Sequence, residues 1–238
     1  KCKDKTFSNI QAILFDKNGT LEDSEINLRH FAQKAARIID AQIPGIGEPL
    51  LMAFGVNGDT LDAAGLIAVA SRRETEIAAA AYIAETGRSW IESLNIARES
   101  LDEADKYFND CPSPLFPGSL ELLQRLSQTE LKLGILSAAT TQEVNQFVKV
   151  HQLGEYLSLE MGVDGNISKP DPGLFIQACE KLGVEPSNTL MVGDSVGDMQ
   201  MARNANAAGC IGITWIGKSD NVKGADIVIN KLDEIQIY

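Results

Sequence analysis

The sequence predicts an α/β protein with a doubly wound, mostly parallel sheet and a second, smaller all-helical domain. Short apolar runs of strand length alternate with helical segments at both ends of the chain, which is typical of parallel sheets covered on both faces. Residues 23–110 carry helical periodicity without a strand pattern. We therefore predict an α/β core formed by residues 1–22 and 111–238, and a helical domain formed by residues 23–110.

The first predicted strand ends in an acidic residue. Residues 12–15 are all apolar, and Asp16 follows them directly, ahead of a turn that contains Gly19. Asp16 is therefore expected at the carboxyl end of a buried strand, where open α/β sheets bind their ligands. Because burying an unpaired carboxylate is costly, we expect Asp16 to bind a metal ion or to take part in chemistry.

Helical signals dominate the segment after this strand. A helical pattern begins at about Ile26, and Gly55 ends a short second helix. Asp59 or Thr60 is expected to cap a further helix over residues 61–70. Two capping-box signals follow: Ser71 with Glu74 for a helix over residues 72–86, and Ser89 with Glu92 for a helix that runs to about Phe108.

The alternation of strands and helices resumes after residue 111, behind a linker rich in Pro and Gly. Apolar runs and helical periodicity then follow one another to the end of the chain. The predicted helices cover residues 119–127, 141–151, 173–183 and 198–208, and the predicted strands cover residues 131–136, 157–161, 189–192, 211–215 and 225–229.

Polar side chains that suit metal and phosphate binding follow several of these strands. Asp16, Asp194 and Asp198 supply carboxylates from distant parts of the chain. Ser137 supplies a hydroxyl and Lys169 an ammonium. Carboxylates from separate strands suit Mg²⁺, which prefers oxygen ligands and shares them with phosphate. The turn amides after Asp16 can form a concave site for the same anion, so we predict a combined magnesium and phosphate site.

Four motifs follow one another in a fixed order along the chain. They are FDKNGT, the apolar run that ends in Ser137, Lys169 within SKPDPGLF, and GDSVGD followed by Met199. In these motifs the chain resembles the haloacid dehalogenase-like (HAD) superfamily, and within it the helical-cap (C1) subgroup of phosphatase type. The resemblance covers residues 10–22 and 111–238. It implies a Rossmann-like core, a cap made of the helical domain, and a hydrolase that forms a phospho-aspartate.

The resemblance also implies roles for individual residues. Asp16 would be the nucleophile, and Mg²⁺ would be held by Asp16, Asp194 and the main-chain carbonyl of Asn18. Asp198 would act through a water molecule or as a partner of these ligands, and Lys169 and position 18 would complete the catalytic set. The residues implied in binding the phosphoryl group are Lys17, Gly19, Thr20, Ser137, Ala138 and Lys169. We expect Lys17 to contribute its backbone amide, with its side chain directed outward.

Position 18 departs from the pattern of the family. Phosphatases of this family carry Asp there, which protonates the leaving group and then activates water, whereas Asn18 has no proton to transfer at neutral pH. The general acid–base contribution, about 10²–10⁴-fold, is therefore expected to be lost. Three explanations stay open: an engineered replacement of Asp that traps a complex, a natural variant for good leaving groups such as acyl or aryl phosphates, and a slow or inactive homologue that still binds phosphate.

The sequence thus predicts a Mg²⁺-dependent phosphohydrolase of small phosphorylated metabolites. Two alternatives stay open, a non-catalytic homologue that binds phosphate or a metabolite, and a carbon–phosphorus bond hydrolase. The second alternative would need a lysine of the cap to form a Schiff base, and the helical domain contains only Lys34 and Lys106, neither in a recognisable context. Dehalogenation is disfavoured by the intact magnesium-site motif.

Composition limits the expected partners and compartment. The formal net charge is −12 and the isoelectric point about 4.6, which argues against nucleic-acid and anionic membrane surfaces as partners. Four cysteines, Cys2, Cys111, Cys179 and Cys210, are widely spaced, and no apolar window reaches the length of a membrane span. We therefore expect reduced thiols in a cytoplasmic protein whose partner is a small phosphorylated metabolite. The oligomeric state is not predicted.

Overall fold

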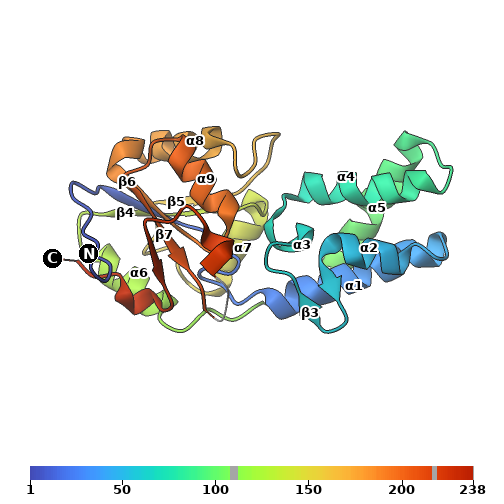
Figure 1. Cartoon of the computed structure of the whole chain (residues 1–238), viewed down its shortest axis with the longest axis horizontal. Helices are drawn as coiled ribbons and strands as arrows, with labels where there is room; N and C mark the ends of the chain where they lie inside the picture. Colours follow the sequence, from blue (N-terminus) through green and yellow to red (C-terminus); the bar gives the residue numbers. More distant parts are fainter. Residues whose placement is uncertain (108–111, 216–218, 238) are drawn as a thin grey trace. The chain divides into compact units, whose positions relative to one another are not determined.

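The computed structural model describes residues 1–107, 112–215 and 219–237. It divides into two compact units (Figure 1). Unit 1 consists of Lys1–Asp23 and Pro114–Tyr238, and unit 2 consists of Ser24–Ser113. The expected helix end at Phe108, the predicted domain boundary after residue 110, and Cys111 fall outside the described residues.

Unit 1 is built on a six-stranded sheet in which every pair of neighbouring strands is parallel. The strand order is β5-β4-β1-β6-β7-β8, so β1 lies between β4 and β6. The strands are β1 (Ala12–Phe15), β4 (Lys132–Leu136), β5 (Leu159–Met161), β6 (Thr189–Gly193), β7 (Gly209–Ile213) and β8 (Ile227–Ile229). All of them overlap the segments in which the sequence predicts strands, although β7 begins and ends two residues before the predicted 211–215.

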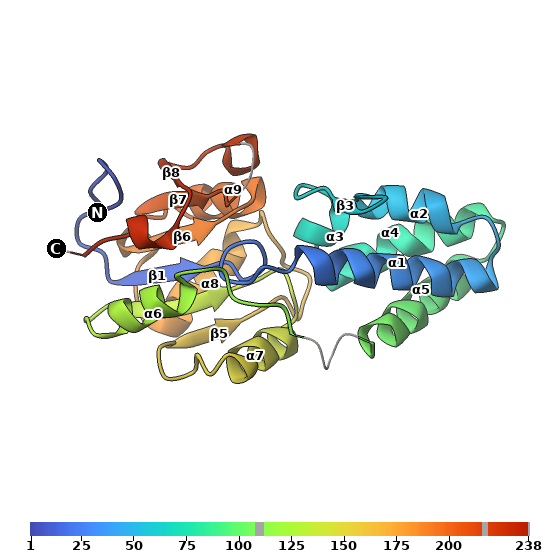
Figure 2. The same ribbon diagram turned by 90° about the horizontal axis from the view of Figure 1, so that it is seen from below.

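Helices cover both faces of this sheet (Figure 2). Successive side chains of a strand point to opposite faces, so Ile13 and Phe15 pack with apolar residues of α6 and α7, while Ala12 and Leu14 pack with those of α8 and α9. The helices are α6 (Ser119–Ser127), α7 (Thr141–Val150), α8 (Pro172–Leu182) and α9 (Val196–Asn204), with short 3-10 turns at Pro186–Asn188, Ser219–Val222 and Leu232–Glu234. This confirms the predicted doubly wound, mostly parallel α/β fold.

Unit 2 packs its helices around an apolar core rich in alanine and isoleucine. Its helices are α1 (Glu25–Gln42), α2 (Gly47–Phe54), α3 (Leu66–Val69), α4 (Arg72–Glu85) and α5 (Trp90–Asp105). The predicted capping box begins α4, because Ser71 Oγ accepts from the Glu74 amide and the Glu74 carboxylate accepts from the Ser71 amide at 2.8 Å. Gly55 ends α2 in the left-handed conformation, with φ of 86°, as its position in the sequence predicts.

The prediction of a purely helical segment between residues 23 and 110 is wrong at one place. Val56–Asn57 (β2) pairs antiparallel with Thr60–Leu61 (β3), and the connection passes through Gly58 at φ of 57°. The loop residues are Gly58 and Asp59, because Asn57 pairs with Thr60, and glycine at the first loop position favours such tight hairpin turns. Thr60 Oγ1 closes the turn by donating to the Asn57 carbonyl at 2.8 Å.

The helix expected over residues 61–70 is also shorter than predicted. Only α3, a single turn, forms there, and its N-cap is Gly65, so neither Asp59 nor Thr60 caps it. The segment before it turns because Asp62 Oδ1 accepts the amide two residues further on, at 2.9 Å. Asp side chains favour such local turns over helix interiors, which explains the lost helical length.

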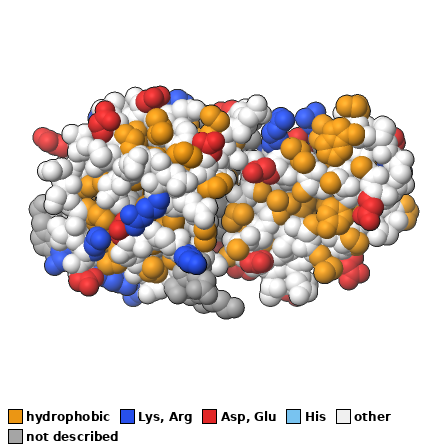
Figure 3. All heavy atoms as spheres, turned by 45° about the horizontal axis from the view of Figure 1, so that its top comes forward, with side chains coloured by type: hydrophobic (Ala, Val, Ile, Leu, Met, Phe, Trp, Pro, Cys, Tyr) orange, Lys and Arg blue, Asp and Glu red, His pale blue; other side chains and the backbone are white. Residues whose placement is uncertain are grey.

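The charged side chains of one face of the molecule can be followed in a space-filling view. On the face shown in Figure 3, Lys and Arg side chains lie in separate small groups among acidic and apolar ones, rather than in one broad basic surface. Among the residues that the structure describes, no helix is long and apolar enough to cross a membrane.

Candidate active site

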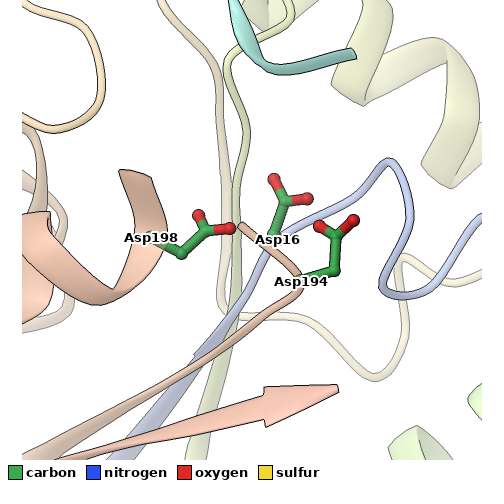
Figure 4. A group of neighbouring side chains, drawn as sticks. All are labelled: Asp16, Asp194 and Asp198. Atoms are coloured by element: carbon green, nitrogen blue, oxygen red, sulfur yellow. The ribbon is translucent and has the colours of Figure 1, made fainter. Parts of the chain in front are cut away.

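The carboxyl ends of β1 and β6 bring two predicted site residues side by side. The strands pair with Phe15 opposite Val192, so Asp16 and Asp194 leave the sheet at the same edge. The Asp16 amide continues the ladder by donating to the Val192 carbonyl at 2.9 Å. The carboxylates of Asp16 and Asp194 lie close together above this edge, and that of Asp198 approaches from α9 (Figure 4).

These three carboxylates form one cluster. Asp16, Asp194 and Asp198 each place one carboxylate oxygen within 4.8 Å of the other two. Asp16 is 6% exposed and Asp198 only 1%, so water screens their charges poorly. Carboxylates this close repel one another unless a cation lies nearby.

A capping box fixes the position of Asp198. Ser195 is the N-cap of α9, and its Oγ accepts from the Asp198 amide at 3.2 Å and donates to Asp198 Oδ2 at 2.6 Å. The Ser195 amide donates to the same oxygen at 3.2 Å. The other oxygen, Oδ1, is also buried and lies 2.7 Å from the ammonium of Lys169. This oxygen of Asp198 therefore faces a cation, the Lys169 ammonium, whereas Oδ2 accepts the hydrogen bonds of the capping box.

Lys169 supplies the one ammonium that contacts the cluster in the described structure. Its Nζ lies 2.5 Å from Asp16 Oδ1 and 2.7 Å from Asp198 Oδ1, and the side chain is only 5% exposed. Burial by itself would lower the pKa of Lys169, but the two carboxylates outweigh it and raise that pKa above its usual value. Lys169 is therefore a permanent cation at neutral pH.

The charges of the cluster are not balanced by Lys169 alone. Burial raises the pKa of Asp16 to about 6, an effect that Lys169 opposes and Asp198 increases. Burial also raises the pKa of Asp194 well above its ordinary value, and its two acidic neighbours add to the shift. Three carboxylates against one ammonium leave two negative charges, which a divalent cation would neutralise. The donors are all carboxylate oxygens within 4.8 Å of one another, so these residues fit Mg²⁺.

The loop after β1 lies directly against the carboxylates. Gly19 has φ of 76°, and a Cβ atom at this position would lie 2.1 Å from Asp194 Oδ2. A Cβ atom on Gly193 would lie 2.5 Å from Asp198 Cγ. Thr20 is fully buried, and its Oγ1 donates to Asp194 Oδ1 at 3.5 Å. Only glycine leaves enough room at positions 19 and 193 for both carboxylates.

The prediction that the Lys17 side chain points outward is wrong. Lys17 is 7% exposed, and its ammonium pairs with Glu22 Oε2 at 2.5 Å and also donates to Asn18 Oδ1. The turn brings Glu22 back, since its amide donates to the Lys17 carbonyl at 2.9 Å. The Asn18 side chain is thereby tied to Lys17, and the described structure shows no hydrogen bond between it and the three aspartates.

Ser137 and Ala138 follow β4, the strand beside β1. Ile135 pairs with Phe15, so these two residues lie at the same edge of the sheet as the aspartate cluster. Ser137 is buried, and its Oγ accepts from the Ala139 amide at 3.2 Å. Ala138 is half-buried. Within the described part of the chain neither residue forms a hydrogen bond with the three aspartates.

Sequence reasoning missed two residues that support the site. Trp215 Nε1 donates to the Gly19 carbonyl at 3.1 Å, although the two residues are 196 positions apart. The indole also stacks on Phe116, with ring centroids 4.3 Å apart. Ser195 had a readable signal, because its spacing to Asp198 is that of a capping box. Trp215 had none, since its contact depends on the folded arrangement of β7 and the loop.

Fold and site together define an α/β enzyme with its acidic residues at the carboxyl edge of a parallel sheet. The family model described as haloacid dehalogenase-like hydrolase matches residues 10–206. The chain therefore belongs to the haloacid dehalogenase-like hydrolases, as the resemblance of its motifs indicates.

Relatives with known names match over nearly their whole length. The chain is 26% identical over 227 residues to the N-acetylmuramic acid 6-phosphate phosphatase of Pseudomonas putida, covering 93% of this chain and 92% of the relative. It is 28% identical over 232 residues to the phosphoglycolate phosphatase of Pectobacterium atrosepticum, covering 95% and 91%. The crystal structure of a predicted phosphoglycolate phosphatase from Haemophilus somnus shares the fold with a TM-score of 0.72 at 20% identity, covering 95% of this chain and 96% of that one.

Proposed function

We propose that this protein is a Mg²⁺-dependent phosphohydrolase of small phosphorylated metabolites that works through phosphorylated Asp16. The observation that carries the proposal is the position of Asp16, at a strand end between the ammonium of Lys169 and the carboxylate of Asp194. The named relatives support the reaction class, because both are phosphatases of small phosphorylated compounds by name.

The metal ion would be held by Asp16, Asp194, the main-chain carbonyl of Asn18 and Asp198. When bound, Mg²⁺ would neutralise charge on the carboxylates and on the phosphoryl oxygens. Gly19 and Gly193 keep space free beside two of these ligands. Ser195 holds Asp198 in place through its capping box.

The chain's own residues would carry the two chemical steps. A carboxylate oxygen of Asp16 attacks phosphorus while the bond from phosphorus to the leaving oxygen breaks, and that oxygen keeps the electron pair. Lys169 stabilises the phosphoryl charge in this step, together with Ser137 and the amides of Lys17 and Ala138. The amides of Gly19 and Thr20, which the motif also suggests for this role, donate to the carbonyls of Glu22 and Lys17 instead. Water then attacks the phospho-aspartate, which releases phosphate and restores the Asp16 carboxylate.

Asn18 sets the expected kinetics. Position 18 offers no carboxyl group to protonate a leaving alkoxide or to deprotonate the attacking water, so both steps forgo a contribution of about 10²–10⁴-fold. We therefore expect slow turnover and a phospho-enzyme that persists long enough to isolate.

Two further features of the setting belong to the proposal. Unit 2 would act as the cap that selects the substrate, because helical inserts in this position do so in the family that the motifs indicate. Cys2, Cys179 and Cys210 are buried free thiols, which supports a reducing, cytoplasmic compartment.

Covalent labelling tests the proposal. The chain is incubated with Mg²⁺ and acetyl phosphate labelled on phosphorus, quenched in acid, and split into samples with and without hydroxylamine. We expect acid-stable label that hydroxylamine removes, no label in Asp16→Asn, and full label in Asp233→Asn, which changes an exposed aspartate. Absence of label from the native chain, or label that survives in Asp16→Asn, would contradict the proposal and favour a non-catalytic homologue.

A further inference from the structure

Lys17 and Glu22 form a buried ion pair beside the nucleophile. Both side chains are 9% exposed, and Nζ lies 2.5 Å from Oε2. The ammonium also lies 5.4 Å from the centre of the Phe147 ring. A buried ion pair contributes little net stability compared with apolar side chains of the same size. We therefore expect this ion pair to have a role other than stabilising the fold.

The ammonium of Lys17 fixes the orientation of the Asn18 amide. Lys17 Nζ carries donors and no acceptor, so the atom of Asn18 that it contacts is the carbonyl oxygen Oδ1. The NH₂ group of Asn18 must then point away from Lys17. Asn18 is half-buried, and within the described residues no protein group accepts a hydrogen bond from its Nδ2. The NH₂ group of Asn18, two residues after Asp16, is therefore a donor of known orientation without a protein acceptor among the described residues.

The turn holds this arrangement rigidly. The amides of Leu21 and Glu22 donate to the Lys17 carbonyl at 3.0 and 2.9 Å, and the Gly19 amide donates to the Glu22 carbonyl at 2.9 Å. Lys17 is thus clamped by its backbone and by its side chain. Contact with a positive charge also polarises the Asn18 amide, which strengthens its N–H groups as donors.

We propose that Asn18 is a fixed hydrogen-bond donor to the leaving oxygen, that Lys17 is its positioning residue, and that the substrates are acyl and aryl phosphates. This inference rests on the proposed function, since it describes the phosphorylation of Asp16. The bond from Asp16 to phosphorus forms, the bond from phosphorus to the leaving oxygen breaks, and the electron pair stays on that oxygen without a proton. A carboxylate or phenolate carries this charge well, and an alkoxide does not.

Position 18 therefore changes the selection of substrates rather than abolishing the reaction. A hydrogen bond from an amide stabilises a developing oxyanion, but it cannot replace the proton that an alkoxide needs. Alkyl phosphates then react slowly, whereas mixed anhydrides and phenyl esters react at rates that depend on the acidity of the leaving group.

A series of leaving groups tests the inference. We measure kcat/KM with Mg²⁺ for acetyl phosphate, a graded series of substituted phenyl phosphates, and ethyl phosphate. The variants are Asn18→Asp, Lys17→Met, Glu22→Gln and Lys149→Met, which removes one exposed positive charge on α7 as a control for Lys17→Met. Inhibition by inorganic phosphate reports for every variant whether the phosphate site is intact. Because kcat/KM covers the steps through phosphorylation, slow hydrolysis of the phospho-enzyme does not obscure the result.

The expected pattern is specific to the proposed roles. The native chain shows a steep dependence of kcat/KM on leaving-group acidity, and Asn18→Asp flattens it by accelerating ethyl phosphate about 10²–10⁴-fold. Lys17→Met lowers kcat/KM for the phenyl phosphates by about tenfold, the value of one oriented hydrogen bond, with phosphate inhibition unchanged. Glu22→Gln retains the contact between Lys17 and Asn18 and keeps the native slope, as does Lys149→Met.

Three results overturn the inference. A native slope as flat as that of Asn18→Asp refutes the substrate class, and Lys17→Met behaving like Lys149→Met refutes the positioning role. Both leave the phosphohydrolase itself standing. If neither the native chain nor Asn18→Asp is phosphorylated on Asp16 by any of these compounds, the proposed function fails and the inference fails with it.

Discussion

Replacing Gly19 with alanine tests how closely the loop after β1 defines the carboxylate cluster. Gly19 has φ of 76°, where a residue with a Cβ atom costs about 1–2 kcal/mol. The new Cβ atom would also lie 2.1 Å from Asp194 Oδ2, whereas ordinary contacts begin at 3.4 Å, so the carboxylate must withdraw by about 1.3 Å. A misplacement of about 1 Å costs roughly 10²-fold in rate. We expect Gly19→Ala to lower the rate of Asp16 phosphorylation by about that factor and to weaken its dependence on Mg²⁺.

Gly87→Ala is the matched control for this variant. Gly87 has φ of 95° in the connection between α4 and α5, and a Cβ atom added there would meet nothing within 4 Å. Urea unfolding should show a similar loss of stability for both variants, since both place alanine at positive φ. A Mg²⁺ titration of the phosphorylation rate should separate them. If Gly19→Ala matches Gly87→Ala in rate and in half-saturating Mg²⁺, the loop does not position Asp194 and the reasoning is refuted.

Three further perturbations probe other parts of the molecule. Lys169→Met should slow phosphorylation of Asp16 by about 10²–10³-fold, the effect of removing one stabilising donor, and an unchanged rate in a quenched time course would contradict its role. The pKa of Asp226 is lowered because, against the effect of burial, a backbone amide and the Arg203 guanidinium donate to its carboxylate. The ionised Asp226 side chain stabilises the folded state above the unfolded pKa of about 4, and this stabilisation is lost as the pH falls through the lower folded pKa. In Asp226→Asn, the free energy of unfolding measured in urea should therefore decrease less steeply at acid pH. An unchanged pH dependence would contradict this reasoning. Ile83 lies in the core of unit 2, and Ile83→Ala should reduce the free energy of unfolding by about 2–5 kcal/mol. Ile91 is 68% exposed, and Ile91→Ala should change the free energy of unfolding by less than about 0.5 kcal/mol. Equal losses of stability would show that burial is not the cause.

The fold was readable from the sequence because its signals are local and repeated. Each core strand is a short apolar run, and several are followed by a helical pattern with a capping residue, such as Thr140 after β4 and Ser195 after β6. The hairpin of β2 and β3 was missed because two-residue strands are too short to show a period of two. Gly58, the first residue of the two-residue loop, was the turn signal available there.

The candidate site was readable to the extent that strand ends meet at one edge of the sheet. The pairing of β1 with β6 is sufficient to place Asp16 beside Asp194. The structure shows that Lys169 also lies beside Asp16. The chemical roles of these three residues stay predictions. The direction of Lys17 could not be predicted, because a lone lysine is normally exposed and its partner Glu22 returns only through the turn. The contact of Trp215 with Gly19 depends on the whole sheet.

The indole of Trp215 gives the nucleophile loop a natural fluorescent reporter. Its N–H donates to the Gly19 carbonyl, so any displacement of that carbonyl alters the surroundings of the fluorophore. The chain contains only one other tryptophan, Trp90, which is 47% exposed on unit 2. In a Trp90→Phe background, all tryptophan emission would come from Trp215, and movement of the loop on ligand binding could be timed by stopped flow without a dye.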